Sequence, residues 1–164
     1  MTLLANQTLL TDRIAKIETL IVDLPTIPGH QLSMTTMTTQ SSVIVKIYTE
    51  GGVLGLGEAA TIGGLSYGPE SPEGMQLTID QYIAPLLIGQ SIASIKALKV
   101  RMAQNIRGNY FAKNAVETAL FDIQGKILNV PISTLLGGKV QDRLSVLWVL
   151  ASGDTEKDIL EAKE

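Results

Sequence analysis

Residues 59–68 form the stretch whose composition best suits the covering of a small ligand. The adjacent glycines Gly63 and Gly64 can adopt a positive φ at no steric cost, so the backbone can bend freely. The bulky apolar side chain of Ile62 and the phenol of Tyr67 stand on this backbone. We therefore predict a flap that begins where a short apolar strand ends. The alternative, an ordinary glycine-rich turn, is the commoner use of such a composition.

A second candidate functional stretch is residues 26–40, which follows Pro25 and contains Pro28-Gly29 among serines, threonines and methionines. Its composition predicts a loop, and a loop of this length in a compact domain is often functional. It carries the only histidine of the chain, His30. The side chain of His30 either contacts a ligand or is solvated, and the sequence favours neither.

Glu58, at the expected end of a strand, is the carboxylate beside the predicted flap. Such a residue can act as a base or a metal ligand. A carboxylate that only accepts hydrogen bonds from loop amides is the more frequent case, and both roles stay open here.

The residue types exclude several other kinds of site. Cysteine is absent, so the chain has no disulfide, thiolate metal site or cysteine nucleophile. A single histidine excludes a multi-histidine metal site. No nucleophile elbow, phosphate loop or zinc motif occurs. The net charge is −3 with scattered basic residues, which argues against a nucleic-acid partner. The apolar runs are far shorter than the roughly 20 residues that span a bilayer. No targeting signal is evident, so we expect a cytoplasmic protein with no membrane partner.

Three strands are the first elements that must position these residues. Apolar and β-branched residues predict strands over residues 14–24, 42–49 and 53–57, and residues 50–52 make a turn between the last two. The result is a three-stranded antiparallel meander, preceded by a loose arm over residues 1–13. In the second strand, one face should be buried: Val43, Val45 and Ile47.

Helices are expected in the next part of the chain. Ser71, followed by a proline, predicts a helix start, and this helix should run to about residue 83 and end before Pro85. Further helices are expected over residues 94–105 and 112–128, with a short helical turn over 132–136. The clearest apolar stripe is that of 112–128: Val116, Ala119, Leu120, Ile123 and Ile127. A meander followed by helices is an α+β pattern.

Residues 144–150 differ from the earlier strands because they are apolar on both faces. Strands buried on both faces are typical of parallel sheets covered by helices. A turn with a helix cap follows over residues 152–154, then a helix over 155–164 with its apolar residues facing inward. We expect this to be the first β-α unit of a second domain in which the sequence stops. Trp148 should point into a core.

Several motifs over most of the chain combine into the pattern of a known family. They are residues 25–33, 57–68, 70–74, Ala112-Lys113 with Glu117, 135–138 and 150–155. Together they resemble the muconate cycloisomerases (muconate lactonizing enzymes) of the enolase superfamily. The Gly-x-Gly-Glu-Ala and Gly-Gly runs recur across the superfamily, whereas residues 61–73 and 151–155 are more specific to the muconate branch.

The resemblance implies a fold and a place for the substrate. It implies an α+β capping domain over residues 14–138 and the start of a truncated (β/α) barrel over 139–164. In the family, two capping-domain loops shape the substrate pocket at the barrel mouth, and residues 26–40 and 59–68 match them. Family members commonly carry a basic residue shortly before the loop histidine, where this chain has Pro28-Gly29. The residues implied to touch substrate are His30, Ile62, Gly63 and Tyr67.

The implied reaction is the cycloisomerisation of cis,cis-muconate, a small dicarboxylate, to muconolactone. The family uses a divalent metal, Mn2+ or Mg2+, to hold the carboxylate next to which a proton moves, and a Lys-x-Lys pair to move that proton. No Lys-x-Lys occurs in this sequence, and the acidic metal ligands lie on later barrel strands. We therefore expect the 164 residues to hold no catalytic residue and no metal, to be inactive alone, and to form a homo-oligomer when full length.

Two kinds of alternative function remain at this point. One is another member of the superfamily: chloromuconate cycloisomerase, dipeptide epimerase or o-succinylbenzoate synthase. The other is a non-catalytic binding module, which would fold stably without further chain.

Overall fold

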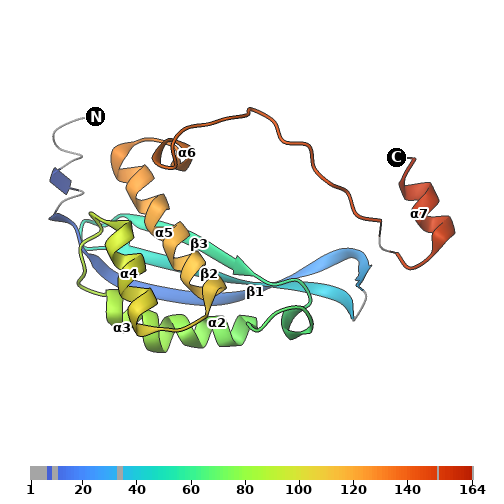
Figure 1. The fold of residues 1–164 in the computed structure, drawn as a ribbon, viewed down its shortest axis with the longest axis horizontal. Coiled ribbons are helices and arrows are strands. Elements are labelled where there is room, and N and C mark those ends of the chain that lie inside the picture. Colours follow the sequence, from blue (N-terminus) through green and yellow to red (C-terminus); the bar gives the residue numbers. More distant parts are fainter. Residues whose placement is uncertain (1–6, 9–10, 33–34, 151, 164) are drawn as a thin grey trace.

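The computed structural model describes residues 7–8, 11–32, 35–150 and 152–163. Its centre is a three-stranded antiparallel sheet in the order β1-β2-β3, with helices against one face (Figure 1). The strands are β1 (Ile14–Gln31), β2 (Thr36–Thr49) and β3 (Leu54–Ala60). This confirms the predicted meander and the α+β class.

The alternation in β2 decides which face of the sheet is buried. Val43, Val45 and Ile47 are fully buried against the helices, and the residues between them are half-buried on the opposite face. In the ladders, Val45 pairs with Thr19 of β1 and with Gly57 of β3. The period of two in the sequence therefore sets the orientation of the whole sheet.

The prediction of a loop over residues 26–40 was wrong. β1 continues through Pro25 to Gln31, and β2 begins at Thr36, so these residues form a long hairpin arm that extends beyond β3 (Figure 1). β1 is an edge strand, where a proline without an N–H can point its nitrogen away from the ladder. The pairing is irregular between Pro25 and His30, as two closely spaced prolines require.

The helices follow the predicted order. They are α2 (Pro72–Thr78), the π-helical turn η2 (Ile79–Ile83), α3 (Ala84–Leu87), α4 (Ile95–Asn105), α5 (Tyr110–Leu128), α6 (Ile132–Leu135) and α7 (Thr155–Glu161). Serine hydroxyls cap two of them. Ser71 Oγ, as expected, accepts a hydrogen bond from Gly74 N at 3.1 Å, and Ser94 Oγ accepts one from Ala97 N at 3.2 Å.

The prediction that the first helical segment ends before Pro85 was wrong. The segment passes through the proline to Leu87 because the preceding turn is a π-helix. In this wider turn, Ala84 N–H donates to the carbonyl of Ile79, five residues back. A widened turn accommodates the missing N–H of a proline without breaking the helix.

The packing of α5 on β3 depends on four small residues. A Cβ added at Gly57 would fall against the carbonyl oxygen of Ala115, and one at Gly55 against that of Ala119. Ala115 and Ala119 are fully buried. Glycine on the strand and alanine on the helix thus let the two backbones approach directly, which larger side chains would prevent.

The free edge of β3 is covered by a charged pair from α5. Asp122 and Lys126 stand one helical turn apart and form an ion pair at 2.6 Å, as their spacing predicts. Asp122 Oδ2 also accepts a hydrogen bond from Leu56 N at 2.8 Å, and Lys126 Nζ donates to Leu54 O at 2.7 Å. The pair therefore satisfies backbone groups that an edge strand would otherwise expose.

The end of the arm expected over residues 1–13 is held to the fold by hydrogen bonds. Asp12 is buried, and its Oδ1 accepts hydrogen bonds from Arg13 N at 2.8 Å and Gly51 N at 2.9 Å. Arg13 also forms a β-bridge with Ser91. The ordered fold thus begins before Ile14. Residues 1–6 and 9–10 lie outside the described residues.

The strand expected over residues 144–150 does not form in this structure. The segment has no strand assignment, and its side chains are exposed. Trp148 is 72% exposed instead of buried in a core, and its indole N–H donates to Glu161 Oε1 at 2.7 Å. A strand needs a hydrogen-bonded neighbour, and no described residue pairs with this segment.

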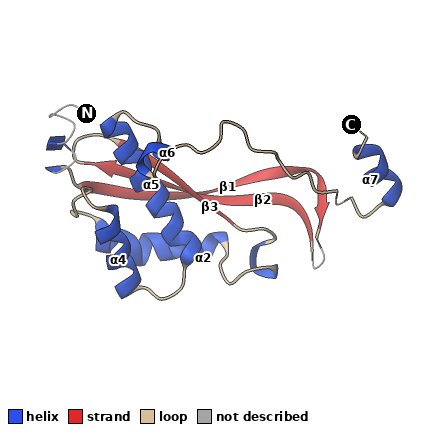
Figure 2. Ribbon diagram, turned by 45° about the horizontal axis from the view of Figure 1, so that its top comes forward, coloured by secondary structure: helices blue, strands red, loops and turns tan. Residues whose placement is uncertain are grey.

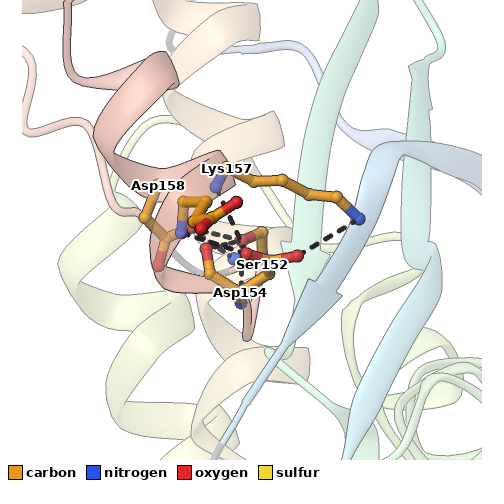
Figure 3. A network of polar contacts seen from close by, with 5 residues as sticks. Ser152, Asp154, Lys157 and Asp158 are labelled. Atoms are coloured by element: carbon orange, nitrogen blue, oxygen red, sulfur yellow. Dashed lines mark hydrogen bonds and ion pairs between the residues drawn. The ribbon is translucent and has the colours of Figure 1, made fainter.

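The helix after this segment forms where expected. α7 stands apart from the helices that cover the sheet (Figure 2). Its cap is Asp154, whose Oδ1 accepts hydrogen bonds from the amides of Glu156 and Lys157, within the polar network of Figure 3. Ile159 and Leu160, expected to face inward, are 51% and 65% exposed.

We expect the substitution Gly57→Ala to lower the free energy of unfolding by at least about 2 kcal/mol, because its methyl group must push α5 away from β3. Urea unfolding followed by circular dichroism measures the change. Gly68→Ala is the matched control, since no atom lies within 4 Å of a Cβ at that position. An equal loss of stability in both variants would contradict the close approach as its cause.

Candidate functional site

Two segments far apart in sequence meet at one end of the sheet. They are the hairpin arm (residues 24–40) and the loop after β3, here called the lid loop (residues 61–69), which contains the short 3-10 helix η1 (Gly64–Ser66). Between them and the start of α2 lies a pocket with a volume of about 430 Å³. Its walls are rich in hydroxyl groups: Thr35, Thr36, Thr38, Thr39, Ser41, Thr61 and Ser71.

Side-chain hydrogen bonds join the lid loop to the hairpin arm. Gln40 Nε2 donates to Thr61 O at 2.9 Å, and Gly63 N–H donates to Met37 Sδ at 3.2 Å. Carbon atoms of the Thr35 and Tyr67 side chains lie 3.2 Å from the place that a Cβ at Gly63 would take, and Gly63 has φ +64°. A residue without a side chain is therefore required at this contact.

The far end of the lid loop is fixed by a buried carboxylate. Glu70 is only 6% exposed, and its two oxygens accept hydrogen bonds from Phe111 N at 3.1 Å and Ala112 N at 3.2 Å. These amides belong to the first turn of α5, whose own cap residue, Asn109, makes no side-chain capping bond. Glu70 thus caps α5 from 40 residues away in the sequence, a contact that no local pattern indicates.

The predicted site residues lie on the hairpin arm and the lid loop. Gly63 lines the pocket. Ile62 and Tyr67 are 63% and 49% exposed on the lid loop. His30 pairs with Met37 in the hairpin arm, and its side chain lies outside the described residues. Leu65, which no sequence pattern singled out, also lines the pocket and is 68% exposed on the same loop.

Glu58 does not stand at the end of its strand. β3 continues to Ala60, and Glu58 pairs with Ile44 and is exposed on the sheet face away from the helices. The predicted flap accordingly begins at Thr61 and not directly after Glu58. Ala59 and Ala60, which we assigned to the flap, belong to the sheet.

The groups with clearly shifted pKa values lie at the opposite end of the hairpin. The side-chain hydrogen bond from Lys16 lowers the pKa of the Glu18 carboxyl, and the hydrogen bond from Tyr48 adds to it. The same contacts with Glu18 raise the pKa of Lys16 and that of Tyr48. Lys16 is exposed, Glu18 and Tyr48 are half-buried, and none of the three lines the pocket, so these shifts belong to the sheet and not to the pocket.

The described residues contain neither a metal-binding cluster nor a membrane-spanning helix. No three histidine, aspartate or glutamate side chains in that part of the chain lie close enough to hold a metal ion, so these residues do not fit a divalent metal. None of the helices described is long and apolar enough to cross a membrane.

Comparison with known proteins relates this architecture to one family. Residues 16–137 match the family described as "Mandelate racemase / muconate lactonizing enzyme, N-terminal domain". The chain belongs to this family. Its three-stranded sheet followed by helices is therefore the capping domain of the enolase superfamily.

Within this family, the chain is similar to proteins named muconate cycloisomerase, muconate lactonizing enzyme and chloromuconate cycloisomerase. Muconate cycloisomerase 1 of Acinetobacter baylyi is 56% identical over 149 residues, which are 90% of this chain and 40% of that protein. A crystal structure of muconate lactonizing enzyme from Pseudomonas fluorescens, complexed with muconolactone, has a TM-score of 0.91 at 55% identity and covers 93% of this chain and 41% of its own. A chloromuconate cycloisomerase from Pseudomonas putida is 40% identical over 152 residues, which are 93% of this chain and 41% of that protein. The chain thus spans about 40% of the length of the relatives it matches.

We expect Glu70→Ala to lower the free energy of unfolding by about 1–2 kcal/mol, because two amides of the first turn of α5 lose their acceptors. Glu70→Gln keeps one side-chain oxygen and should lose less. Urea unfolding measures both variants. The control is Glu50→Ala in the exposed turn between β2 and β3, which should leave the midpoint unchanged; a similar loss there would argue against the cap.

Proposed function

We propose that this chain is the substrate-capping part of a muconate cycloisomerase, which converts cis,cis-muconate to muconolactone. The observation that carries the proposal is the meeting of the hairpin arm and the lid loop at one pocket, in a chain 56% identical to a muconate cycloisomerase. Chloromuconate cycloisomerase is less well supported, because the identity to it is 40%. A non-catalytic module has no observation in its favour.

In this proposal residues 14–138 are the capping domain and residues 139–164 begin the barrel. The capping domain covers the bound dicarboxylate and excludes water from it. Ile62 and Tyr67 supply apolar and phenolic contact from the lid loop, and Gly63 lets the loop pack closely against the hairpin arm. His30, on the hairpin arm, contacts the substrate from the other segment.

The chemistry of proton transfer belongs to other parts of the enzyme in this proposal. The described residues form no group that fits a divalent metal, so Mn2+ or Mg2+ is held by barrel residues beyond those present here. The complete enzyme is a homo-oligomer that acts on a small dicarboxylate.

We expect the 164-residue chain to show no loss of muconate absorbance in the presence of Mn2+. A chimera that joins residues 1–164 to the remaining length of the Acinetobacter baylyi relative should convert muconate, because it adds the barrel to the cap. Turnover by the 164 residues alone, or an inactive but folded chimera, would refute the proposed division of roles. The unaltered relative serves as the positive control.

In that chimera, Ile62→Ala should raise KM for muconate about tenfold, because it removes the proposed apolar contact between the lid loop and the bound dicarboxylate. Tyr67→Phe should raise KM less, because the ring stays. Steady-state kinetics with muconate and chloromuconate measure the effect. Ile88→Ala is the matched control, because Ile88 is an exposed isoleucine directly after α3 and does not line the pocket. If Ile88→Ala changes KM as strongly as Ile62→Ala, the assignment of Ile62 is wrong.

A further inference from the structure

Gln40 occupies the point where the sheet gives way to the lid loop. The ladder between β2 and β3 ends at the pair Ser42 and Ala60. Two residues before Ser42, the half-buried Gln40 pairs with Leu24 of β1 on one side. On the other side its amide, and not its backbone, reaches Thr61 O at 2.9 Å. The side chain of Gln40 thus adds one more cross-strand hydrogen bond beyond the last backbone pair.

The buried position of Thr61, the first residue of the lid loop, is energetically unfavourable for its hydroxyl group. Thr61 is 8% exposed, and among the described residues its Oγ1 is buried without a hydrogen-bond partner. Burying an unsatisfied hydroxyl is unfavourable. A contact that holds Thr61 must offset this cost, and the hydrogen bond from Gln40 is the one that reaches its carbonyl.

The rest of the lid loop depends on this first contact. Gly63 follows two residues later and donates to Met37 Sδ, and sulfur is a weak acceptor. Ile62 lies between the two bonds and is exposed. The backbone at Ile62 is therefore held by the hydrogen bond to Thr61 O before it and by the weaker one from Gly63 N–H after it.

We propose that Gln40 is a positioning residue for substrate binding, which fastens the lid loop to β2 and so places Ile62 and Tyr67. This inference rests on the proposed function for its effect on muconate, but the contact itself does not. Gln40 acts through Thr61 and does not touch the substrate. Without the Gln40 amide, the end of the lid loop is still held through Glu70, whereas Thr61 at its start loses the hydrogen bond to its carbonyl.

The first test measures the contact without any activity. In the 164-residue chain, Gln40→Met keeps the length of the side chain and removes the donor. Hydrogen exchange of the Gly63 amide should become at least about tenfold faster, whereas amides of β2 and α5 should keep their rates. Gln104→Met, on the exposed face of α4, is the matched control and should change neither. An unchanged Gly63 rate in Gln40→Met would overturn the proposal.

The second test measures the role in binding, in the chimera described above. Gln40→Met should raise KM for muconate about tenfold with kcat within about twofold. Gln40→Glu should behave in the same way at pH 7.5, where the carboxylate cannot donate to the Thr61 carbonyl. Near pH 4, below the ordinary glutamate pKa of about 4.3, the protonated acid can donate, so KM of Gln40→Glu relative to the unsubstituted chimera should fall. A merely structural role would not give this pH-dependent rescue.

The outcomes separate the two proposals. Faster Gly63 exchange with an unchanged KM would show that Gln40 holds the loop but does not position it for substrate, and the inference would fail. An inactive unsubstituted chimera would refute the proposed function, whereas the exchange experiment would still decide whether Gln40 fastens the lid loop.

Discussion

The close approach of α5 to β3 is the contact on which the rest of the structure depends. Gly55 and Gly57 leave no room for a side chain, and the backbones of Ala115 and Ala119 lie directly against them. Once α5 lies at this distance, its charged residues reach the free edge of β3 and its first turn reaches Glu70. One steric constraint therefore fixes the edge of the sheet and the far end of the lid loop together.

The candidate site is built where regular structure ends. The hairpin arm extends past β3, so its outer part has no third strand beside it. The lid loop fills this place and is joined to the arm by side-chain hydrogen bonds instead of a ladder. Side-chain contacts of this kind are easier to change by substitution than a backbone ladder.

Membership of the mandelate racemase / muconate lactonizing enzyme family agrees with this arrangement. The described residues hold no group of metal ligands, and they contribute a pocket wall rich in hydroxyl groups. The family match identifies residues 16–137 as the N-terminal capping domain. The exposed apolar segment over residues 144–150 leads to α7 near the outer end of the hairpin arm, where Gln31 lies against Gly153 (Figure 1).

Local patterns in the sequence determined the three strands, the buried face of β2, the serine caps of α2 and α4 and the apolar stripe of α5, because each depends on residues a few positions apart. The tertiary structure alone decided the rest. Pro25 lies within a strand because β1 is an edge, and Glu70 caps a helix that starts 40 residues later. Trp148 is exposed because no described strand pairs with its segment. Edge position, distant caps and strand partners depend on which elements become neighbours in space, and no short stretch of sequence contains that information.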